Sequence, residues 1–281
     1  MDYTTNQPPA PRRIEVVRPP TGGYKSALFD FDGTVSLLRE GWQQVMIPYF
    51  TEVLSAAAPG RDPDEVCRSV TDFVDMLTGK QTIFQCRKLA EEVAEAGGKP
   101  ADPYEYKREY LRRLMERIAG RLDALRSGGA DPAQFLVPGS REFLGRLKSR
   151  GVKLYVASGT DEADVLEEAR LLGLDRFFDG GVYGALDSVT ACSKELVIKR
   201  ILEENKLEGA ELVGFGDGFV EIQLVKEAGG YAVAAATDEA NRAGVNAWKR
   251  ARLLKAGADA VIPDFSGYEE LESFLFGERN A

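Results

Sequence analysis

Short apolar runs alternate with amphipathic segments along the second half of the chain. Apolar runs of this length fit buried strands, and segments with apolar residues three and four positions apart fit helices that cover a sheet. The expected strands are residues 25–31, 151–157, 181–183, 212–215, 231–236 and 258–262, and the expected helices are 161–172, 194–204, 220–228, 239–254 and 268–276. This alternation predicts an α/β fold with a doubly wound, Rossmann-like parallel sheet.

Between the first two expected strands, the hydrophobic pattern indicates helices and no strands. Residues 37–137 hold amphipathic segments separated by breaks rich in Gly and Pro. A connection of this length is far beyond an ordinary crossover, so we expect an inserted all-helical domain. The predicted division is a flexible N-terminal arm at 1–23, an α/β core from 24–36 plus 138–281, and the helical domain at 37–137. Residues 13–17 of the arm are an alternative short edge strand.

Polar side chains gather where the expected strands end or the next helix begins. They are Asp30, Asp32, Ser158, Lys194, Asp217 and Glu221. Because ligands collect at the carboxyl ends of the strands in an open parallel sheet, we expect these residues at one edge. A lone carboxylate there is usually a turn former or a helix cap. Several acids together with a serine and a lysine at one edge of the sheet predict an active site.

The composition narrows the chemistry of this site. The 281-residue chain contains no His, which excludes Ser-His-Asp and Cys-His catalysis and His metal ligands. Its 36 Lys and Arg against 45 Asp and Glu give a net charge of −9, which argues against nucleic acid or an anionic membrane as partner. Cys67, Cys86 and Cys192 are few and far apart, so we expect buried thiols without a disulfide framework. With neither a signal peptide nor a membrane-spanning run evident, the interpretation is a cytoplasmic protein.

The polar residues also follow a known order of motifs. Asp30-x-Asp32-Gly33-Thr34, then Ser158, Lys194 and Gly216-Asp217-x-x-x-Glu221, resembles the haloacid dehalogenase-like superfamily of phosphohydrolases in all four of its motifs. The resemblance spans most of the chain outside the arm. It implies a phosphate site formed by Phe31, Ser158, Gly159 and Lys194. It also implies a Mg²⁺ site formed by Asp30, the Asp32 backbone carbonyl, Asp217 and Glu221.

The residue types themselves suit phosphoryl transfer. Asp30 and Asp217 offer the hard oxygen ligands that Mg²⁺ prefers. A carboxylate such as Asp30 can attack phosphorus and form an aspartyl-phosphate, while the Lys194 ammonium and the Ser158 hydroxyl stabilise the phosphoryl oxygens. Asp32 lies two residues further on, where its carboxyl can protonate the leaving group and then deprotonate the hydrolytic water.

The acid at position 32 also distinguishes branches of the resembled superfamily, because the dehalogenase branch lacks it. The helical insertion looks like the cap of the phosphoglycolate phosphatase and β-phosphoglucomutase group. We therefore expect a Mg²⁺-dependent phosphatase for a small phosphomonoester, either a sugar phosphate or a phosphoglycolate-like acid. The alternative is a β-phosphoglucomutase-like phosphomutase. More remote alternatives are a non-catalytic phosphate-binding protein and a receiver-like signalling protein.

Within the helical insertion, Gly79, Lys80 and Gln81 are the residues expected to touch the substrate. Lys80 either binds a second anionic group or is a solvated lysine in an ordinary helix–helix turn. Arg39 and Trp42 either line the entrance or pack at the hinge. Further along, the basic residues Lys249, Arg250, Arg252 and Lys255 fit the solvated face of a helix.

Overall fold

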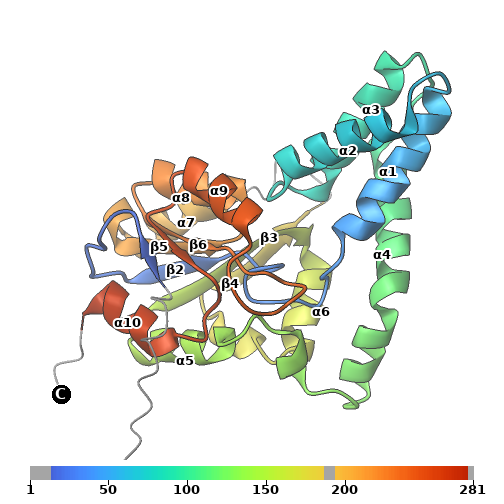
Figure 1. The fold of residues 1–281 in the computed structure, drawn as a ribbon. Helices are drawn as coiled ribbons and strands as arrows, with labels where there is room; N and C mark the ends of the chain where they lie inside the picture. The colour runs from blue at the N-terminus through green and yellow to red at the C-terminus, as the bar shows by residue number, and fades with distance from the viewer. Residues whose placement is uncertain (1–13, 187–193, 278–281) are drawn as a thin grey trace, which may run out of the picture.

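A seven-stranded sheet forms the centre of the computed structural model, which describes residues 14–186 and 194–277 (Figure 1). Its strand order is β1-β7-β6-β5-β2-β3-β4. The strands are β1 (Glu15–Val16), β2 (Ser26–Phe29), β3 (Lys153–Asp161), β4 (Gly181–Ala185), β5 (Leu212–Gly216), β6 (Tyr231–Ala235) and β7 (Ala260–Ile262). β1 pairs antiparallel with β7, and the other neighbours pair in parallel. The predicted α/β fold is confirmed.

Helices cover both faces of this sheet (Figure 1). One face carries α7 (Lys194–Asn205), α8 (Phe219–Glu227) and α9 (Ala247–Lys255), and the other carries α5 (Ser140–Ser149), α6 (Glu162–Leu171) and α10 (Tyr268–Phe276). Side chains of successive strand residues point to opposite faces. In β2, Ala27 and Phe29 therefore join one buried apolar cluster, and Leu28 joins the other.

Four helices lie between β2 and β3 in the chain. They are α1 (Gln43–Ala57), α2 (Pro63–Leu77), α3 (Thr82–Glu95) and α4 (Pro103–Arg126), and they stand beside the sheet as a separate unit (Figure 1). α2 and α4 both begin with Asp-Pro. Asp62 and Asp102 accept hydrogen bonds from backbone N–H groups of the first turn, and the fixed φ of proline suits the first helical position.

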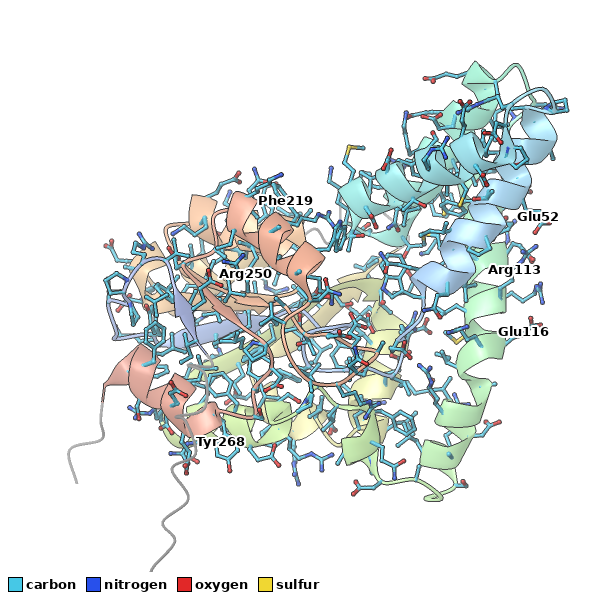
Figure 2. The ribbon with its side chains drawn as sticks, viewed as in Figure 1. Glu52, Arg113, Glu116, Phe219, Arg250 and Tyr268 are labelled. Atoms are coloured by element: carbon cyan, nitrogen blue, oxygen red, sulfur yellow. The ribbon has the colours of Figure 1, made fainter. Side chains whose placement is uncertain are left out.

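The outer helices α1 and α4 are joined by an apolar and a charged contact. Phe50 and Leu114 are buried in the cluster between the helices. On the surface, Arg113 Nη1 lies 2.8 Å from Glu52 Oε2, and Figure 2 labels both residues. The Arg113 guanidinium also lies 4.4 Å from the centre of the Tyr49 ring. The buried apolar contact supplies most of the stability, because exposed ion pairs contribute less than about 1 kcal/mol.

The N-terminal residues that the structure describes are attached to the sheet. β1 fits the edge strand that was the alternative to a flexible arm, and Ile14 beside it is buried. Arg18 Nε lies 2.9 Å from Asp259 Oδ1, while the backbone N–H groups of Val17 and Arg18 donate to the Asp259 carbonyl. These contacts fix the chain as far as the start of the core.

The structure corrects the expected start of one C-terminal helix and the expected burial of one cysteine. The helix expected at 239–254 begins only at Ala247, because Asn246 accepts a hydrogen bond from the Lys249 N–H and so caps the helix there. Cys86 is buried as expected, but Cys67 is exposed because it lies on the outer face of α2. Cys192 lies outside the described residues.

The described residues include no helix that combines the length and the apolar character needed to cross a bilayer.

Candidate active site

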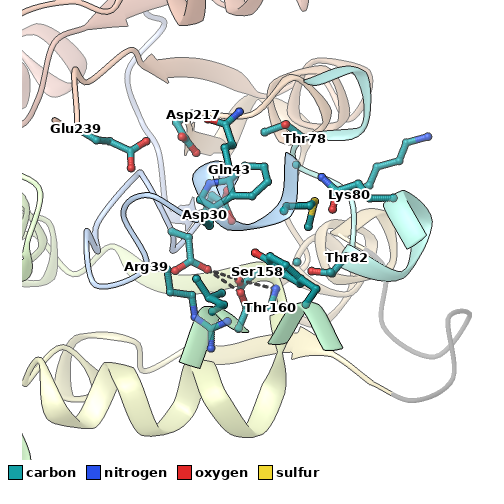
Figure 3. Close-up of a pocket in the computed structure, with 18 of the residues that line it drawn as sticks. Asp30, Arg39, Gln43, Thr78, Lys80, Thr82, Ser158, Thr160, Asp217 and Glu239 are labelled. Carbon is teal, nitrogen blue, oxygen red and sulfur yellow. Dashed lines mark hydrogen bonds between the residues drawn. The ribbon is translucent and has the colours of Figure 1, made fainter. Parts of the chain in front are cut away.

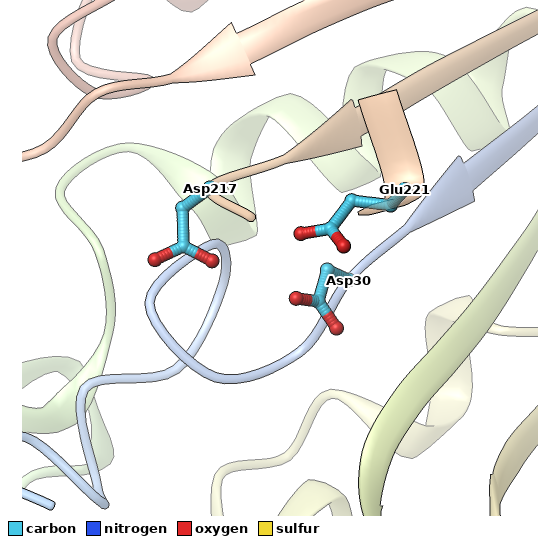
Figure 4. Close-up of side chains that lie close together, drawn as sticks. All are labelled: Asp30, Asp217 and Glu221. Atoms are coloured by element: carbon cyan, nitrogen blue, oxygen red, sulfur yellow. The ribbon is translucent and has the colours of Figure 1, made fainter. Parts of the chain in front are cut away.

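Three carboxylates converge at the carboxyl edge of the sheet (Figure 4). Asp30 follows β2, Asp217 follows the neighbouring strand β5, and Glu221 lies in the first turn of α8. Each offers an oxygen atom, and these oxygens all lie within 4.8 Å of one another. Carboxylate oxygens at this spacing suit one Mg²⁺ ion, so the donor set fits the expected metal.

Lys194 holds two of these acids together. Its Nζ lies 3.0 Å from Asp30 Oδ1 and 3.0 Å from Glu221 Oε2, and all three side chains are buried. Burial lowers the pKa of Lys194, but the two carboxylates outweigh burial and raise it. Burial also raises the pKa of Asp30 well above its usual range, although Lys194 opposes that shift. A bound cation would favour the ionised form of Asp30.

Asp32 is held by the hydroxyl groups of two residues from the end of β3, Ser158 and Thr160, which Figure 3 labels. Thr160 Oγ1 donates to Asp32 Oδ2 at 2.8 Å, and Ser158 Oγ lies 3.5 Å from the same oxygen. The other oxygen, Oδ1, is buried without a hydrogen-bond partner in the part of the chain that the structure describes. Burial raises the pKa of Asp32, with Arg39 opposing. A raised pKa suits a carboxyl that must donate a proton.

A tight turn brings Asp32 back over the sheet edge. The Phe31 carbonyl accepts hydrogen bonds from the N–H groups of Thr34, Val35 and Ser36, while the Phe31 ring is buried in the core. Gly33 has φ +76°, and a Cβ there would lie 2.8 Å from the Asp217 Cγ. Only glycine fits both this conformation and the close approach of Asp217.

Residues 78–81, which connect α2 and α3, approach the carboxyl edge of the sheet with their main chain. A Cβ on Gly79 would lie 2.8 Å from Glu221 Oε2, and one on Gly159 would lie 2.9 Å from the Lys80 carbonyl oxygen. The Lys80 side chain is exposed, and Figure 3 shows it leading away from Asp30 toward solvent. Its Nζ lies 5.8 Å from the centre of the Phe84 ring. Gln81 is buried beside the start of α3.

Arg39 connects the segment after the first motif to α6. Its guanidinium donates to Glu168 Oε1 at 2.7 Å and 2.9 Å and to Asp164 Oδ2 at 3.0 Å. Arg39 and Glu168 are both buried. Arg39 thus joins this segment to the core, and it also contributes to the lining of the cleft above Asp30.

The cleft above Asp30 has a volume of about 110 Å³. Its walls on the side of the helical insertion are mostly uncharged and able to form hydrogen bonds: Trp42, Gln43, Thr78, Thr82, Gln85 and Tyr110. Sequence reasoning did not assign substrate contacts to most of these residues, because side chains on amphipathic helices give no sign of which inward positions face an opening.

Lys249 lies at the site, where the sequence pattern did not place it. It was expected on a solvated helix face, but its Nζ lies 2.6 Å from Asp217 Oδ2 and 2.5 Å from Glu239 Oε1. Burial lowers the pKa of Lys249, and the two carboxylates outweigh burial and raise it. Asn246 was the available signal in the sequence, because asparagine often caps the start of a helix. A helix that starts there has Lys249 in its first turn and leaves Glu239 in the preceding loop.

The structure combines an α/β fold with a cluster of acidic side chains at the carboxyl edge of its parallel strands, and the family comparison assigns this combination to the hydrolases. The family model described as haloacid dehalogenase-like hydrolase matches residues 24–229. The chain belongs to this family, and the resemblance found in its motifs is confirmed.

Similar proteins include both phosphatases and a phosphomutase. A "Phosphorylated carbohydrates phosphatase" of Thermotoga maritima is 32% identical over 92 residues, which cover 33% of this chain and 42% of that protein. A structure described as a "predicted phosphoglycolate phosphatase" from Haemophilus somnus 129pt matches with a TM-score of 0.59 and 17% identity, over 89% of this chain and 99% of that chain. β-Phosphoglucomutase from Clostridium difficile matches with a TM-score of 0.57 and 14% identity, over 90% of this chain and 97% of that chain. The structural matches show the fold alone.

Proposed function

We propose that the protein is a Mg²⁺-dependent phosphatase that hydrolyses a small phosphorylated carbohydrate. The observation that carries this proposal is the joint placement of Asp30, Lys194 and Asp32 beneath one cleft. Asp30, Asp217 and Glu221, with the Asp32 backbone carbonyl, would hold Mg²⁺. The bound ion would supply charge neutralisation at the phosphoryl oxygens and at Asp30.

Each side chain of the site has its own role in the two steps of the proposed hydrolysis. An Asp30 oxygen attacks phosphorus, the bond from phosphorus to the leaving oxygen breaks, and the Asp32 proton passes to that oxygen. Asp32 then accepts a proton from water, whose oxygen attacks phosphorus and releases Asp30 and inorganic phosphate. Lys194 and the Ser158 hydroxyl stabilise the phosphoryl oxygens through both steps.

The walls of the cleft favour an uncharged, hydroxylated leaving group. Among the described residues that line it, Arg39, Lys194 and Lys249 each face acid partners, and Lys80 extends toward solvent. A phosphoglycolate-like acid needs a further cation for its carboxylate. A phosphomutase with a bisphosphate intermediate needs one for its second phosphate. Amide and hydroxyl groups such as those of Gln43 and Gln85 suit sugar hydroxyls.

Phosphate release from a panel of metabolites tests the proposal. The panel contains hexose and pentose phosphates, phosphoglycolate and β-glucose 1-phosphate, each assayed for free phosphate and for isomerised product in the presence of Mg²⁺. Sugar phosphates are expected to give the highest kcat/KM, and Asp30→Asn is expected to abolish turnover. Asp72→Asn, an exposed change of the same chemistry on α2, is the matched control. Isomerised product without free phosphate would establish the phosphomutase instead.

A further inference from the structure

Lys249 forms a buried ion-pair group outside the known motifs. Its Nζ lies 2.6 Å from Asp217 Oδ2 and 2.5 Å from Glu239 Oε1, so one ammonium bridges two carboxylates. The side chains of Lys249, Asp217 and Glu239 are 13%, 12% and 19% exposed. Because partial burial reduces screening by solvent, this contact is stronger than a surface ion pair.

The chain after β6 brings Glu239 and Lys249 to the edge of the sheet where the metal-site acids lie. The loop from 237 to 246 closes on itself, because Thr237 bridges to Val245 and the Asn246 N–H donates to the Ala236 carbonyl at 2.8 Å. Asn246 Oδ1 then accepts the Lys249 N–H at 3.0 Å and fixes the first turn of α9. Glu239 and Lys249 are therefore held by defined backbone structure.

The ion pairs at this edge contain more carboxylates than ammonium groups. The ion pairs join two ammonium groups to four carboxylates: Lys194 and Lys249 to Asp30, Asp217, Glu221 and Glu239. With every carboxylate ionised, these six ion-paired groups carry a net charge of −2, which one Mg²⁺ would balance. Lys194 contacts Asp30 and Glu221, so Lys249 is the cation that contacts the remaining metal-site acid, Asp217.

We infer that Lys249 is a built-in counter-cation of Asp217, which stabilises the metal-free site and weakens Mg²⁺ binding, and that Glu239 limits this effect by sharing the ammonium. Lys249 is a positioning residue, since it acts through Asp217. The inference rests on the proposed Mg²⁺ site. An ammonium beside a metal ligand repels the incoming cation and occupies one carboxylate oxygen. Without Glu239, the full charge of Lys249 falls on Asp217.

Mg²⁺ affinity measured by calorimetry on the purified full-length protein tests the inference without any turnover. Lys249→Met is expected to tighten Mg²⁺ binding by roughly tenfold, because a repelling charge close to the site is gone. Glu239→Gln is expected to weaken it by roughly threefold or more. Lys255→Met removes an exposed lysine from the same helix and is expected to leave the affinity unchanged. Lys249→Gln replaces Lys249→Met if the latter fails to fold.

Two further measurements separate a local effect from general electrostatics. In the double variant Lys249→Met/Glu239→Gln, the effect of Glu239→Gln should largely vanish, because Glu239 acts through Lys249. Thermal unfolding should show a lower Tm for metal-free Lys249→Met than for the unmodified protein, and a larger rise of Tm on adding Mg²⁺.

The outcomes that overturn the inference are distinct from failure of the proposed function. Unchanged or weaker Mg²⁺ binding by the Lys249 variants overturns the counter-cation role and leaves the phosphatase proposal standing. Full additivity in the double variant overturns the role of Glu239. An unmodified protein that binds no Mg²⁺ overturns the metal site itself, and the inference with it.

Discussion

Gly33→Ala is the substitution whose effect follows most directly from the geometry. Gly33 has φ +76°, and an added Cβ would lie 2.8 Å from the Asp217 Cγ. Carbon atoms in contact prefer about 3.5–4.0 Å, so the Asp217 carboxylate or the turn must shift by roughly 1 Å. A misplacement of about 1 Å in catalytic machinery costs on the order of 100-fold in rate. We expect a loss of this size in kcat/KM, accompanied by weaker Mg²⁺ binding.

The matched control is Gly151→Ala. Gly151 has φ +78°, almost the same conformation, but an added Cβ would meet nothing within 4 Å. Both variants should lose about 1–2 kcal/mol of unfolding free energy from the left-handed conformation, measured by urea denaturation. Only Gly33→Ala should also lose activity and Mg²⁺ affinity. Equal activity in the two variants would refute the argument that Gly33 makes room for Asp217.

Three more predictions follow from single contacts. Thr160→Val removes the hydroxyl that donates to the Asp32 carboxylate and should raise the pKa of Asp32. Because Asp32 then stays protonated to higher pH, the loss of sugar-phosphate hydrolysis at high pH should move to higher pH. Thr160→Ser keeps the hydroxyl and should keep the original pH profile. Arg39→Met leaves Glu168 buried without its cation and should cost about 3–5 kcal/mol in urea unfolding; a loss below about 1 kcal/mol would show that this pair is not a structural anchor. Lys80→Ala should change kcat/KM for sugar phosphates by less than about threefold, because the ammonium lies in solvent; a large rise in KM would show that Lys80 turns inward onto the substrate.

The strand ends were the part of the site that the sequence predicted well. Asp30 and Asp217 each follow an apolar run. Parallel pairing of those two runs alone places both acids at the same edge of the sheet. Lys194 is placed similarly, because it begins a helix on one face of the sheet.

Contacts made by loops and helix starts could not be predicted in the same way. The charged pattern after residue 239 fits a helix, but the Asn246 cap delays the helix and turns Lys249 into the site. Periodicity describes which face of a helix is polar and does not identify the neighbour of that face. The close approach of Gly79 to Glu221 likewise depends on how the helical unit sits on the core.

The two-residue strand β1 has a consequence for the behaviour of the protein at high concentration. β7 would otherwise be an open edge, with free N–H and C=O groups able to pair with another chain. β1 covers that edge in antiparallel register, and Arg18 and its ion pair with Asp259 add charge beside it. A chain shortened past Arg18 should therefore keep its active-site residues yet self-associate through exposed β7, which light scattering would detect. If it does, pairing of β1 with β7 limits self-association of the chain.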